Sequence, residues 1–221
     1  MLHLAIIMDG NGRWANAQNK PRHYGHKEGA KKIKEILQGC LELGVTHLSL
    51  YAFSTENWKR PKSEVDFLMK LLERYLKSEK ATYIENKIAF KSIGDLSMFS
   101  NKLQRLIYEL EEETKEGAKL TQYLALNYGA KDEIIRTFNK LNANALSFSE
   151  ENIKSHLDNP QDVDILIRTG GDYRLSNFLL WQCAYAELFF TKTLWPDFSK
   201  EELEKIIQEF HNRERRFGGL N

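Results

Sequence analysis

The sequence predicts a single α/β domain over residues 1–221, with a mainly parallel six-stranded central sheet and helices on both of its faces. Two observations lead to this fold class. Strand-like apolar runs alternate with amphipathic helical patterns, an order typical of parallel sheets that are covered on both sides. No internal repeat, low-complexity tract or linker interrupts the 221 residues, which are enough for one large domain with a substantial core.

Six strand-like runs and five helical patterns make up this alternation. The expected strands are Leu4–Met8, Thr46–Phe53, Ile88–Ile93, Leu120–Asn127, Val163–Ile167 and Glu187–Thr191. The expected helices are His26–Leu43, Ser63–Lys77, Phe99–Lys115, Asp132–Leu141 and Ser199–Arg213. In the first helix Ala30, Ile33 and Leu37 share one face, lysines lie opposite, and Gly44 follows as a stop. Ligands gather beyond the carboxyl ends of the strands in such sheets.

The second helix, which we expect to open with Ser63 as its cap, is apolar on more than its inner face. Phe67 and Leu71 lie apart from the stripe that contains Val65 and Leu72. Burial between neighbouring elements is one explanation, and an apolar tunnel is the other. At about 0.8 kcal/mol per buried CH₂, a hydrocarbon chain of some fifteen carbons would gain roughly 10 kcal/mol from such a wall.

Composition limits the possible functions. The formal net charge is +1, so a general nucleic-acid binder is not expected and any recognition of anions must be local. Cys40 and Cys183 lie among apolar neighbours and match no metal-ligand spacing, which is typical of reduced core cysteines in a cytosolic protein. The N-terminus does not read as a signal peptide, and the apolar stretch Phe178–Phe190 is too short and too polar to span a bilayer. We therefore expect a soluble, cytoplasmic protein.

The stretch Ala5-Ile6-Ile7-Met8-Asp9-Gly10-Asn11-Gly12-Arg13-Trp14-Ala15 indicates an anion site at the carboxyl end of a strand. The apolar run stops at Asp9, and the glycines that follow let backbone N–H groups converge on a ligand. Asp9 would repel an anion unless it binds a divalent cation that is also bound to the anion. Mg²⁺ with a diphosphate is the usual such pair. The alternative is a plain strand–turn–helix connection in which Asp9 only caps.

A dinucleotide site competes for the same stretch, because Gly10 to Ala15 fits the pattern G-x-G-x-x-A directly after a strand. Pro21 leaves little room for the long helix that should follow such a motif at once. No acidic residue closes a second strand at about the twenty-residue offset that ribose binding needs. The dinucleotide interpretation is therefore the weaker one.

Further polar residues follow the same strand ends. Arg22, His23 and His26 come soon after the glycine loop, where cations can neutralise phosphate oxygens and a histidine can move a proton. The second strand ends in the polar and aromatic loop Phe53–Pro61, at the edge of the sheet where loops often carry function. Taken singly, a histidine at such a position is as often structural, and the loop could serve packing alone.

A second anion cradle follows the strand Val163–Ile167. In Arg168-Thr169-Gly170-Gly171-Asp172-Tyr173-Arg174-Leu175-Ser176-Asn177, two arginines and a serine surround a glycine pair. A guanidinium grips a diphosphate through paired donors, and each charged hydrogen bond contributes about 1.5–3 kcal/mol. An arginine-rich surface turn with an Asp172–Arg174 pair is the alternative. Two anion cradles at one edge of a sheet nevertheless indicate two phosphorylated substrates that lie side by side.

These residues carry a resemblance to a known family. The sequence resembles the cis-prenyltransferases, most closely the bacterial undecaprenyl diphosphate synthases. The matching blocks are MDGNGRWA, GHKEGA, LYAFSTENWKRP, IGD, NYG, RTGGDYRLSNFLLWQCAYAELFFTKTLWPDF and NRERRFGG, between Met8 and Gly219. Members of that family condense farnesyl diphosphate with successive isopentenyl diphosphates, and each addition leaves a cis double bond. The resemblance implies a long-chain product, undecaprenyl diphosphate, the precursor of the lipid carrier for cell-wall peptidoglycan synthesis.

The resemblance also implies roles for the matching residues. Asp9, His26 and Asn57 would be catalytic, with Mg²⁺ held by Asp9. The allylic diphosphate would be bound by Gly10, Asn11, Gly12, Arg13, Arg22 and His26, the isopentenyl diphosphate by Arg168, Arg174 and Ser176, and the substrates further by Trp14, Ser54, Glu56, Asn57, Trp58 and Arg60. Glu64 also matches a position that the family uses. Asp172 stands where relatives commonly have the longer glutamate, which leaves its contact open.

Assembly and location follow from the same resemblance. It implies a homodimer in which Glu187 reaches across the interface as a metal ligand and the tail Arg216–Gly218 completes the partner's site. A transient contact with the inner face of the plasma membrane would allow product release. Three rival hypotheses remain: a non-catalytic subunit that binds prenyl diphosphates, a dinucleotide enzyme and a purely structural dimer. The paired D-D-x-x-D signature of trans-prenyltransferases is absent from the sequence.

Overall fold

The computed structural model describes residues 1–214, in which six strands form one sheet with the order β3-β4-β2-β1-β5-β6. Every pairing in this sheet is parallel. The strands are β1 His3–Ile7, β2 His47–Ser54, β3 Ile88–Ile93, β4 Leu120–Tyr128, β5 Ile165–Arg168 and β6 Glu187–Phe190. The helices are α1 Asn11–Ala17, α2 Arg22–Glu42, α3 Lys62–Glu85, α4 Asn101–Thr114, α5 Ala130–Ala143, α6 Glu150–His156 and α7 Lys200–Asn212. The predicted fold class is confirmed.

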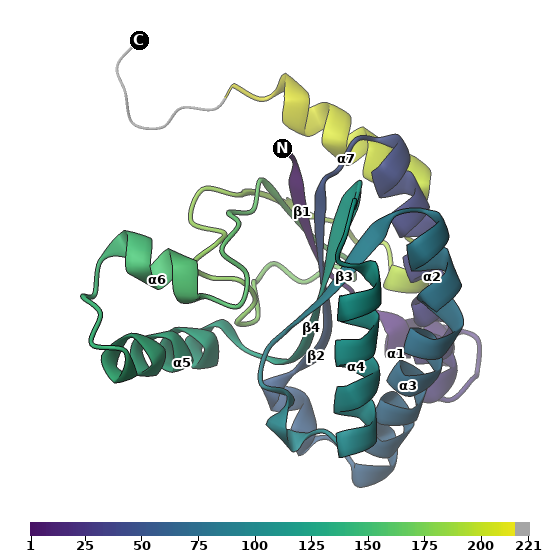
Figure 1. The fold of residues 1–221 in the computed structure, drawn as a ribbon. Helices are drawn as coiled ribbons and strands as arrows, with labels where there is room; N and C mark the ends of the chain where they lie inside the picture. Colours follow the sequence, from purple (N-terminus) through teal and green to yellow (C-terminus); the bar gives the residue numbers. More distant parts are fainter. Residues whose placement is uncertain (215–221) are drawn as a thin grey trace.

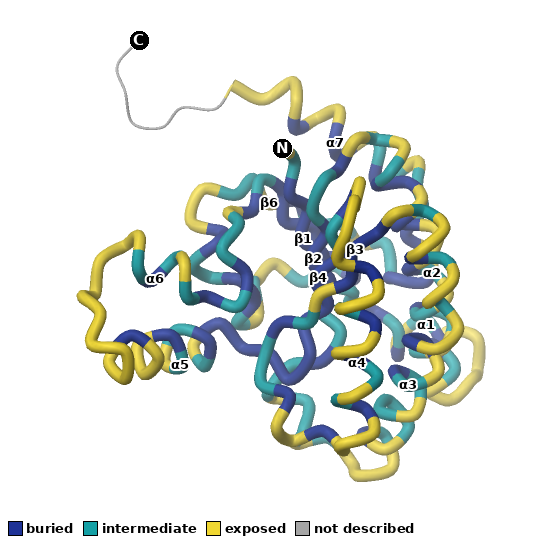
Figure 2. Tube along the Cα trace, viewed as in Figure 1, coloured by how far each residue is buried: buried dark blue, intermediate teal, exposed yellow. Residues whose placement is uncertain are grey.

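Helices lie on both faces of the sheet, as Figure 1 shows. Helices α2, α3, α4 and α7 cover one face, and the packing between them and the strands forms the larger core. The other face carries α5, α6 and the segment 178–183, which form a second and smaller core. Figure 2 shows the strands and the inward sides of the helices buried. All five residues of β1 are buried, as a central strand of a parallel sheet requires.

Local sequence signals explain most helix ends, but the predicted start and end of α3 were wrong. Helix α2 stops before Gly44, whose positive φ of 72° suits glycine at this position. Helix α3 begins at Lys62, directly after Pro61, so Ser63 lies inside its first turn and is not the cap. It also runs to Glu85 and not to Lys77, because the buried apolar face continues through Tyr83. The short helices α1 and α6 were not among the predicted elements.

The register of the sheet brings the loops of interest together. Ile7 at the end of β1 pairs with Arg168 at the end of β5, so Asp9 and the loop after Arg168 leave the sheet side by side. On the other side of β1, Ser54 at the end of β2 pairs with Tyr128 at the end of β4. The carboxyl edge therefore collects the loops that follow β1, β2, β4 and β5.

Candidate active site

A cavity of about 630 Å³ lies between the sheet and helices α2 and α3. Its size is typical of a site for a small organic ligand. At the carboxyl edge of the sheet, polar residues line it: Asp9, Asn11, His26, Ser54, Glu56, Asn57, Arg60, Arg168, Ser176 and Asn177. Away from that edge the wall is largely apolar, with Ala30, Ile33, Ala52, Phe53, Leu68, Met69, Leu71, Leu72, Leu124 and Leu126. The predicted apolar tunnel is thus present beside the predicted anion loops.

Asp9 lies where the apolar wall meets the polar edge and is bound by cations on both oxygens. Its Oδ1 accepts the backbone N–H of Gly10 at 2.6 Å and lies 3.1 Å from Nη2 of Arg13. Its Oδ2 accepts a hydrogen bond from Nη2 of Arg168 at 3.0 Å. Partial burial works against ionisation, but the hydrogen bond from Arg168 and the charges of both arginines outweigh it and lower the pKa of Asp9. The carboxylate is therefore ionised and available as a hard oxygen ligand.

Arg168 is the buried centre of the second cradle. Its side chain is only 5% exposed. Nη1 donates to the carbonyl oxygen of Arg174 at 2.5 Å and to the Ser176 hydroxyl at 2.7 Å. Nη2 also donates to Oδ2 of Asp172 at 3.3 Å, and the same oxygen accepts from Arg174 at 2.8 Å. Asp172, whose contact the sequence left open, therefore joins the two arginines of the cradle.

Glu64, in the first turn of α3, contacts three basic side chains near the polar end of the cavity. Its Oε1 lies 3.0 Å from Nη1 of Arg60, 3.6 Å from Nη2 of Arg22 and 3.5 Å from Nε2 of His26. Burial, with the charge of Arg60 next in importance, lowers the pKa of His26 to about 4 although Glu64 acts in the other direction. The imidazole is therefore neutral near pH 7, and it can donate or accept a proton.

Several polar atoms of the cavity wall are buried without a hydrogen-bond partner in the described part of the chain. Among the described residues these include Oδ1 of Asn11, Nε2 of His26 and Nε of Arg168. Buried polar groups are normally paired, so an unpaired set that faces one cavity indicates a polar ligand. Gly29 makes room beside them, because a Cβ at that position would lie 2.1 Å from Oδ1 of Asn11.

The loop after β2 forms the third side of the site. Oδ1 of Asn57 accepts the backbone N–H of Ser54 at 3.2 Å, which holds the short 3-10 helix Thr55–Lys59 against the end of β2. Oε1 of Glu56 accepts from Asn177 at 3.2 Å and so ties this loop to the second cradle. Trp58 does not line the cavity; its ring packs on Phe53 and Phe99, and its Nε1 donates to Asn127.

Like Trp58, the predicted site residues Trp14 and Glu187 do not line the cavity. The Trp14 indole stacks on Tyr24 and donates to Asp197 at 2.6 Å. Glu187 begins β6 and pairs with Ile165, three residues before Arg168, so it lies toward the opposite edge of the sheet and accepts from Arg213 at 2.7 Å. Within one chain Glu187 is therefore not beside Asp9, and its role across a dimer stays a prediction. The predicted tail Arg216–Gly218 lies outside the described residues.

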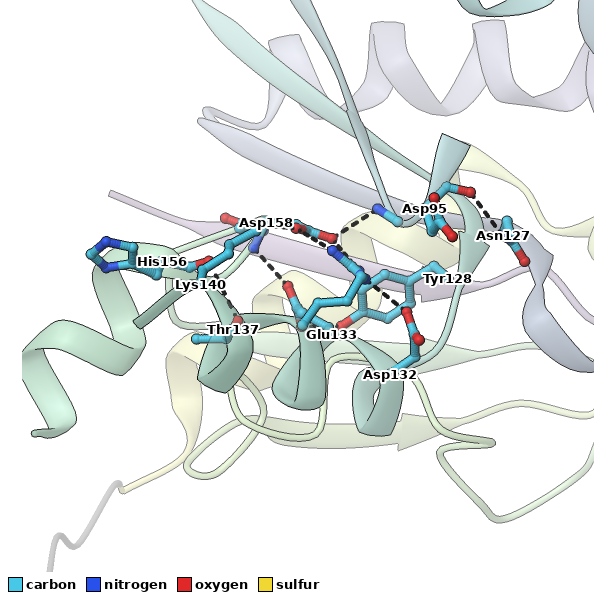
Figure 3. Close-up of polar contacts among 12 residues, drawn as sticks. Asp95, Asn127, Tyr128, Asp132, Glu133, Thr137, Lys140, His156 and Asp158 are labelled. Carbon is cyan, nitrogen blue, oxygen red and sulfur yellow. Dashed lines mark hydrogen bonds and ion pairs between the residues drawn. The ribbon is translucent and has the colours of Figure 1, made fainter. Parts of the chain in front are cut away.

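A polar network that the sequence did not reveal lies beside α5, outside the cavity lining (Figure 3). Buried Glu133 accepts from the Tyr128 hydroxyl at 2.5 Å, from Gln182, and from the backbone N–H of Asp158 at 2.9 Å. Asp158 in turn accepts from both Nη atoms of Arg136, at 2.9 and 2.6 Å, and from the backbone N–H of Gly94. The network joins α5 to the ends of β3 and β4. Its members are far apart in the sequence and carry no local pattern, so only the fold identifies them.

Comparison with known proteins agrees with this site. A family model described as "Putative undecaprenyl diphosphate synthase" matches residues 7–218, nearly the whole chain. The chain belongs to the undecaprenyl diphosphate synthase family. The matched range includes the glycine loop after β1, the loop after β2 and the arginine cradle after β5.

Relatives of this family match over the full length. The isoprenyl transferase of Helicobacter hepaticus is 58% identical over 99% of this chain and 97% of its own. The crystal structure of a probable undecaprenyl diphosphate synthase from Campylobacter jejuni has a TM-score of 0.86 at 44% identity, covering 98% of each chain. The lavandulyl diphosphate synthase of Lavandula x intermedia, solved in complex with dimethylallyl diphosphate, has a TM-score of 0.93 at 33% identity, again over 98% of each. The chain is accordingly a cis-prenyltransferase by family.

Residues 1–214 contain neither a clustered metal-binding group nor a membrane-spanning helix. No group of three or more His, Cys, Asp or Glu side chains in this part of the chain is arranged to hold a metal ion. No described helix is both long enough and apolar enough to cross a bilayer.

Proposed function

We propose that this member of the undecaprenyl diphosphate synthase family condenses farnesyl diphosphate with successive isopentenyl diphosphates to give undecaprenyl diphosphate. One observation carries the proposal: a single cavity joins an apolar wall to two groups of cationic side chains at the carboxyl edge of the sheet. An apolar wall suits an isoprenoid chain, and the cations suit its diphosphate. The dimethylallyl diphosphate bound by the solved Lavandula relative supports an allylic diphosphate in this fold.

The two cradles divide the substrates. We assign the allylic diphosphate to the loop after β1, where Gly10, Asn11, Gly12 and Arg13 lie, with Arg22 and His26 beside it. The isopentenyl diphosphate is assigned to Arg168, Arg174 and Ser176, which Nη1 of Arg168 links by donating to the carbonyl oxygen of Arg174 and to the Ser176 hydroxyl. Ser54, Glu56, Asn57, Trp58, Arg60 and Trp14 complete the proposed substrate site. The link between Glu56 and Asn177 supports this arrangement, because it connects the loops on which the two substrates would meet.

The donor set near Asp9 fits Mg²⁺. Mg²⁺ in phosphate sites uses one or two carboxylates together with waters and substrate oxygens, so Asp9 alone could anchor it to a bound diphosphate. Both carboxylate oxygens engage arginines in this structure, so binding would require Arg13 or Arg168 to turn toward phosphate oxygens instead. When bound, the metal would offset the negative charge that develops on the leaving diphosphate.

The protein's own groups would position and stabilise the reacting atoms. Arg13 and the loop N–H groups would hold the departing diphosphate of the allylic substrate as its carbon–oxygen bond breaks. The double bond of isopentenyl diphosphate then attacks the allylic carbon, and loss of a proton completes the addition. Nε2 of neutral His26 is buried with no hydrogen-bond partner among the described residues, and Oδ1 of Asn57 accepts the backbone N–H of Ser54. These two side chains would orient substrate oxygens and assist the proton transfer.

The wider biological role is part of the same proposal. We infer that residues 1–221 act as one catalytic domain in the cytoplasm, that the product serves cell-wall peptidoglycan synthesis, and that it leaves by transient contact with the membrane. A homodimer is supported by β6, which is the edge strand of the sheet and leaves Leu188 39% and the preceding Tyr185 74% exposed. In such a dimer Glu187 and the Arg216–Gly218 tail would act in the partner's site.

One experiment tests the proposal and its rivals. Purified protein is incubated with labelled isopentenyl diphosphate, farnesyl diphosphate and Mg²⁺, and the extracted lipid is sized. Label that enters polyprenyl lipid of about eleven isoprene units supports the proposal, and label that stays water-soluble contradicts it. Thermal unfolding with farnesyl diphosphate or with NAD(P) then separates a non-catalytic prenyl-binding subunit from a dinucleotide enzyme, because a ligand raises Tm only for a protein that binds it.

A further inference from the structure

Asn177, which directly follows Ser176 of the second cradle, joins three segments of the chain. Its backbone carbonyl oxygen accepts the N–H of Ala130 at 2.8 Å, and its side-chain Oδ1 accepts the N–H of Lys131 at 3.0 Å. Its Nδ2 donates to Oε1 of Glu56 at 3.2 Å. One residue therefore binds the start of α5 on one side and the loop after β2 on the other.

The two bonds to α5 stand in for a side-chain cap. Gly129 is the N-cap residue of α5, and a glycine has no side chain that could accept a first-turn N–H. The same glycine allows a close approach, because a Cβ there would lie 2.6 Å from Nδ2 of Asn177 and 2.9 Å from Oγ1 of Thr55. The start of α5, the loop after β2 and the second cradle thus meet at Asn177.

The backbone of this part of the cradle is strained. Ser176, Asn177 and Leu179 have φ values of 48°, 63° and 45°, in the left-handed region that side chains other than asparagine and aspartate seldom adopt. Such a conformation persists only where neighbouring groups fix it, and it is most frequent at functional sites. Here the Tyr51 hydroxyl donates to the carbonyl oxygen of Ser176 at 3.3 Å, and the Tyr51 ring stacks on Phe178 at a centroid distance of 4.3 Å.

The groups that Asn177 connects face the same cavity. Ser176, Asn177 and Glu56 all line it. Ser176 accepts a hydrogen bond from Arg168 of the second cradle, and Glu56 lies in the same 3-10 helix as Asn57. Both polar atoms of the Asn177 side chain already have partners in the chain, so its contacts indicate a role in holding these groups and not in binding a ligand.

We propose that Asn177 is a positioning residue that sets the spacing between the two substrates. It fixes the second cradle through its backbone and the loop after β2 through its side chain. This inference rests on the proposed function, in which the two substrates react between these loops. Reaction between two bound molecules requires their reacting atoms within about 3–3.5 Å, and a misplacement of about 1 Å can cost roughly 100-fold in rate. Loss of the link to Glu56 should therefore slow the condensation more than it weakens binding.

Aspartate at position 177 separates this role from the capping of α5. Asn177→Asp keeps an oxygen for the Lys131 N–H, and a carboxylate suits a helix N-terminus. Burial works against ionisation of Glu56, but the hydrogen bonds that it accepts, one of them from Asn177, lower its pKa. The second oxygen of the aspartate would therefore repel the Glu56 carboxylate instead of donating to it. Adding Glu56→Gln restores the hydrogen bond with donor and acceptor exchanged.

Two readouts test the inference. The first is the single-turnover rate at which farnesyl diphosphate condenses with labelled isopentenyl diphosphate and Mg²⁺, together with the concentration of each substrate that gives half of this rate. The second is hydrogen exchange of the backbone amides in residues 54–60, which reports the link without any substrate. Both are measured for the wild type, for Asn177→Asp and Glu56→Gln alone, and for the two substitutions combined.

Asn142→Asp is the matched control, because Asn142 is an exposed residue of α5 outside the cavity lining. The Tm of each variant checks folding. If Asn177→Asp does not fold, Asn177→Gly takes its place in the comparison with the wild type, since glycine suits the positive φ and removes both side-chain bonds.

The inference predicts that Asn177→Asp slows the condensation by roughly 10–100-fold while the half-saturating concentrations change little. Hydrogen exchange in residues 54–60 should become faster. In the Glu56→Gln background the same substitution should cost far less, because the link is present again. Asn142→Asp should match the wild type in both readouts.

Unchanged hydrogen exchange in residues 54–60 of Asn177→Asp would overturn the link. Faster exchange with an unchanged condensation rate would overturn the positioning role, and so would an equal cost of Asn177→Asp with and without Glu56→Gln. A wild-type protein that condenses nothing would refute the proposed function instead, while hydrogen exchange would still decide whether the link exists.

Discussion

Nη2 of Arg168 donates to Oδ2 of Asp9 at 3.0 Å and so joins the loops that follow two neighbouring strands. Asp9 is the proposed metal ligand, and Arg168 is the proposed centre of the isopentenyl cradle. Their ion pair holds both groups at one point of the sheet edge and offsets the cost of burying the guanidinium. This ion pair links the two anion cradles directly. The roles of Asp9 and Arg168 can therefore be separated only by measuring the kinetics of each substrate in turn.

Replacing Asp9 with alanine should leave the fold intact and remove most turnover. The side chain lies in a loop after β1 and not in the core, but it is the carboxylate proposed to anchor Mg²⁺. We expect kcat to fall by about 10²–10³-fold, the scale seen when one charge-stabilising group leaves an active site. Asp162→Ala is the control, since Asp162 is 64% exposed and pairs with Lys154. Near-normal turnover of Asp9→Ala at saturating Mg²⁺ would show the assignment to be wrong.

Arg168→Lys should weaken isopentenyl diphosphate far more than farnesyl diphosphate. Lysine keeps the charge but loses the planar fork that serves Ser176, Asp172 and Asp9 together. At about 1.5–3 kcal/mol for each charged hydrogen bond lost, KM for isopentenyl diphosphate should rise roughly 10–100-fold. Steady-state kinetics with each substrate varied in turn measures this, with exposed Arg105→Lys as the control. Equal changes in both KM values would contradict the division of the two cradles.

The sequence was sufficient for the parts of the site that follow directly on strands. Asp9 and Arg168 each come just after an apolar run, and parallel strands bring such positions to one edge, so their meeting could be expected. Of the predicted second apolar side of α3, Leu71 lines the cavity, whereas Phe67 does not and packs against the His23 ring.

The remaining features depend on packing between distant segments. Nothing local in the sequence shows that Trp58 turns away from the cavity to Asn127, or that Glu64 contacts two arginines and a histidine. The same holds for Glu133, whose buried carboxylate is satisfied by residues from three separate segments. Helix α1 was missed because its seven residues are too few to show a hydrophobic period.

Stability should fall between neutral and weakly acidic pH through His3. Its Nδ1 faces the carbonyl oxygen of Asp162 and its Nε2 faces the Ser49 hydroxyl, which fixes a neutral imidazole with the proton on Nδ1. Burial lowers the pKa of His3 to about 4; neighbouring His47 also lowers it, and Asp164 raises it. The unfolded chain therefore takes up the proton first as the pH drops through 6.5, and stability is lost from there down to about pH 4.

The size of this loss can be measured by urea unfolding at several pH values. His3 alone should account for up to about 3 kcal/mol between pH 7 and pH 4. His3→Gln, which keeps a polar side chain at that position, should show a shallower pH dependence than the wild type. His211→Gln on the exposed side of α7 is the control and should follow the wild-type curve. Identical slopes for His3→Gln and the wild type would contradict the assignment.

Two glycines of α2 should respond in opposite ways to alanine. A Cβ at Gly29 would lie 2.1 Å from Oδ1 of Asn11 and 2.8 Å from Cδ1 of Trp195, so Gly29→Ala forces the glycine loop to move. We expect a loss of about 1–3 kcal/mol in the free energy of unfolding, together with lower kcat/KM for farnesyl diphosphate. A Cβ at Gly39 would meet only the flexible side chain of Lys200, at 3.2 Å, and Leu203 at 3.5 Å. Gly39→Ala should therefore stabilise the helix by up to about 1 kcal/mol, and a Gly29→Ala variant as active and stable as Gly39→Ala would refute the close approach.

Removing Arg136 should destabilise the protein, because the Asp158 carboxylate labelled in Figure 3 would lose its main cationic partner. The Asp158 side chain is 13% exposed; its burial disfavours ionisation, yet the hydrogen bonds and charge of Arg136 lower its pKa. Among residues 1–214, Arg136→Met leaves this charge with only Lys140 at 3.5 Å and the Gly94 N–H, so the free energy of unfolding should fall by about 3 kcal/mol.

A matched surface pair distinguishes this loss from a general effect of removing a charge. Lys77→Met breaks the exposed pair with Glu73 and should cost at most about 1 kcal/mol. Adding Asp158→Asn to Arg136→Met removes the unpaired charge and should recover part of the lost stability, which a simple packing defect at Arg136 would not allow. Urea unfolding of the four proteins measures the difference. If Arg136→Met were as mild as Lys77→Met, the network would not be what holds α5 to the ends of β3 and β4.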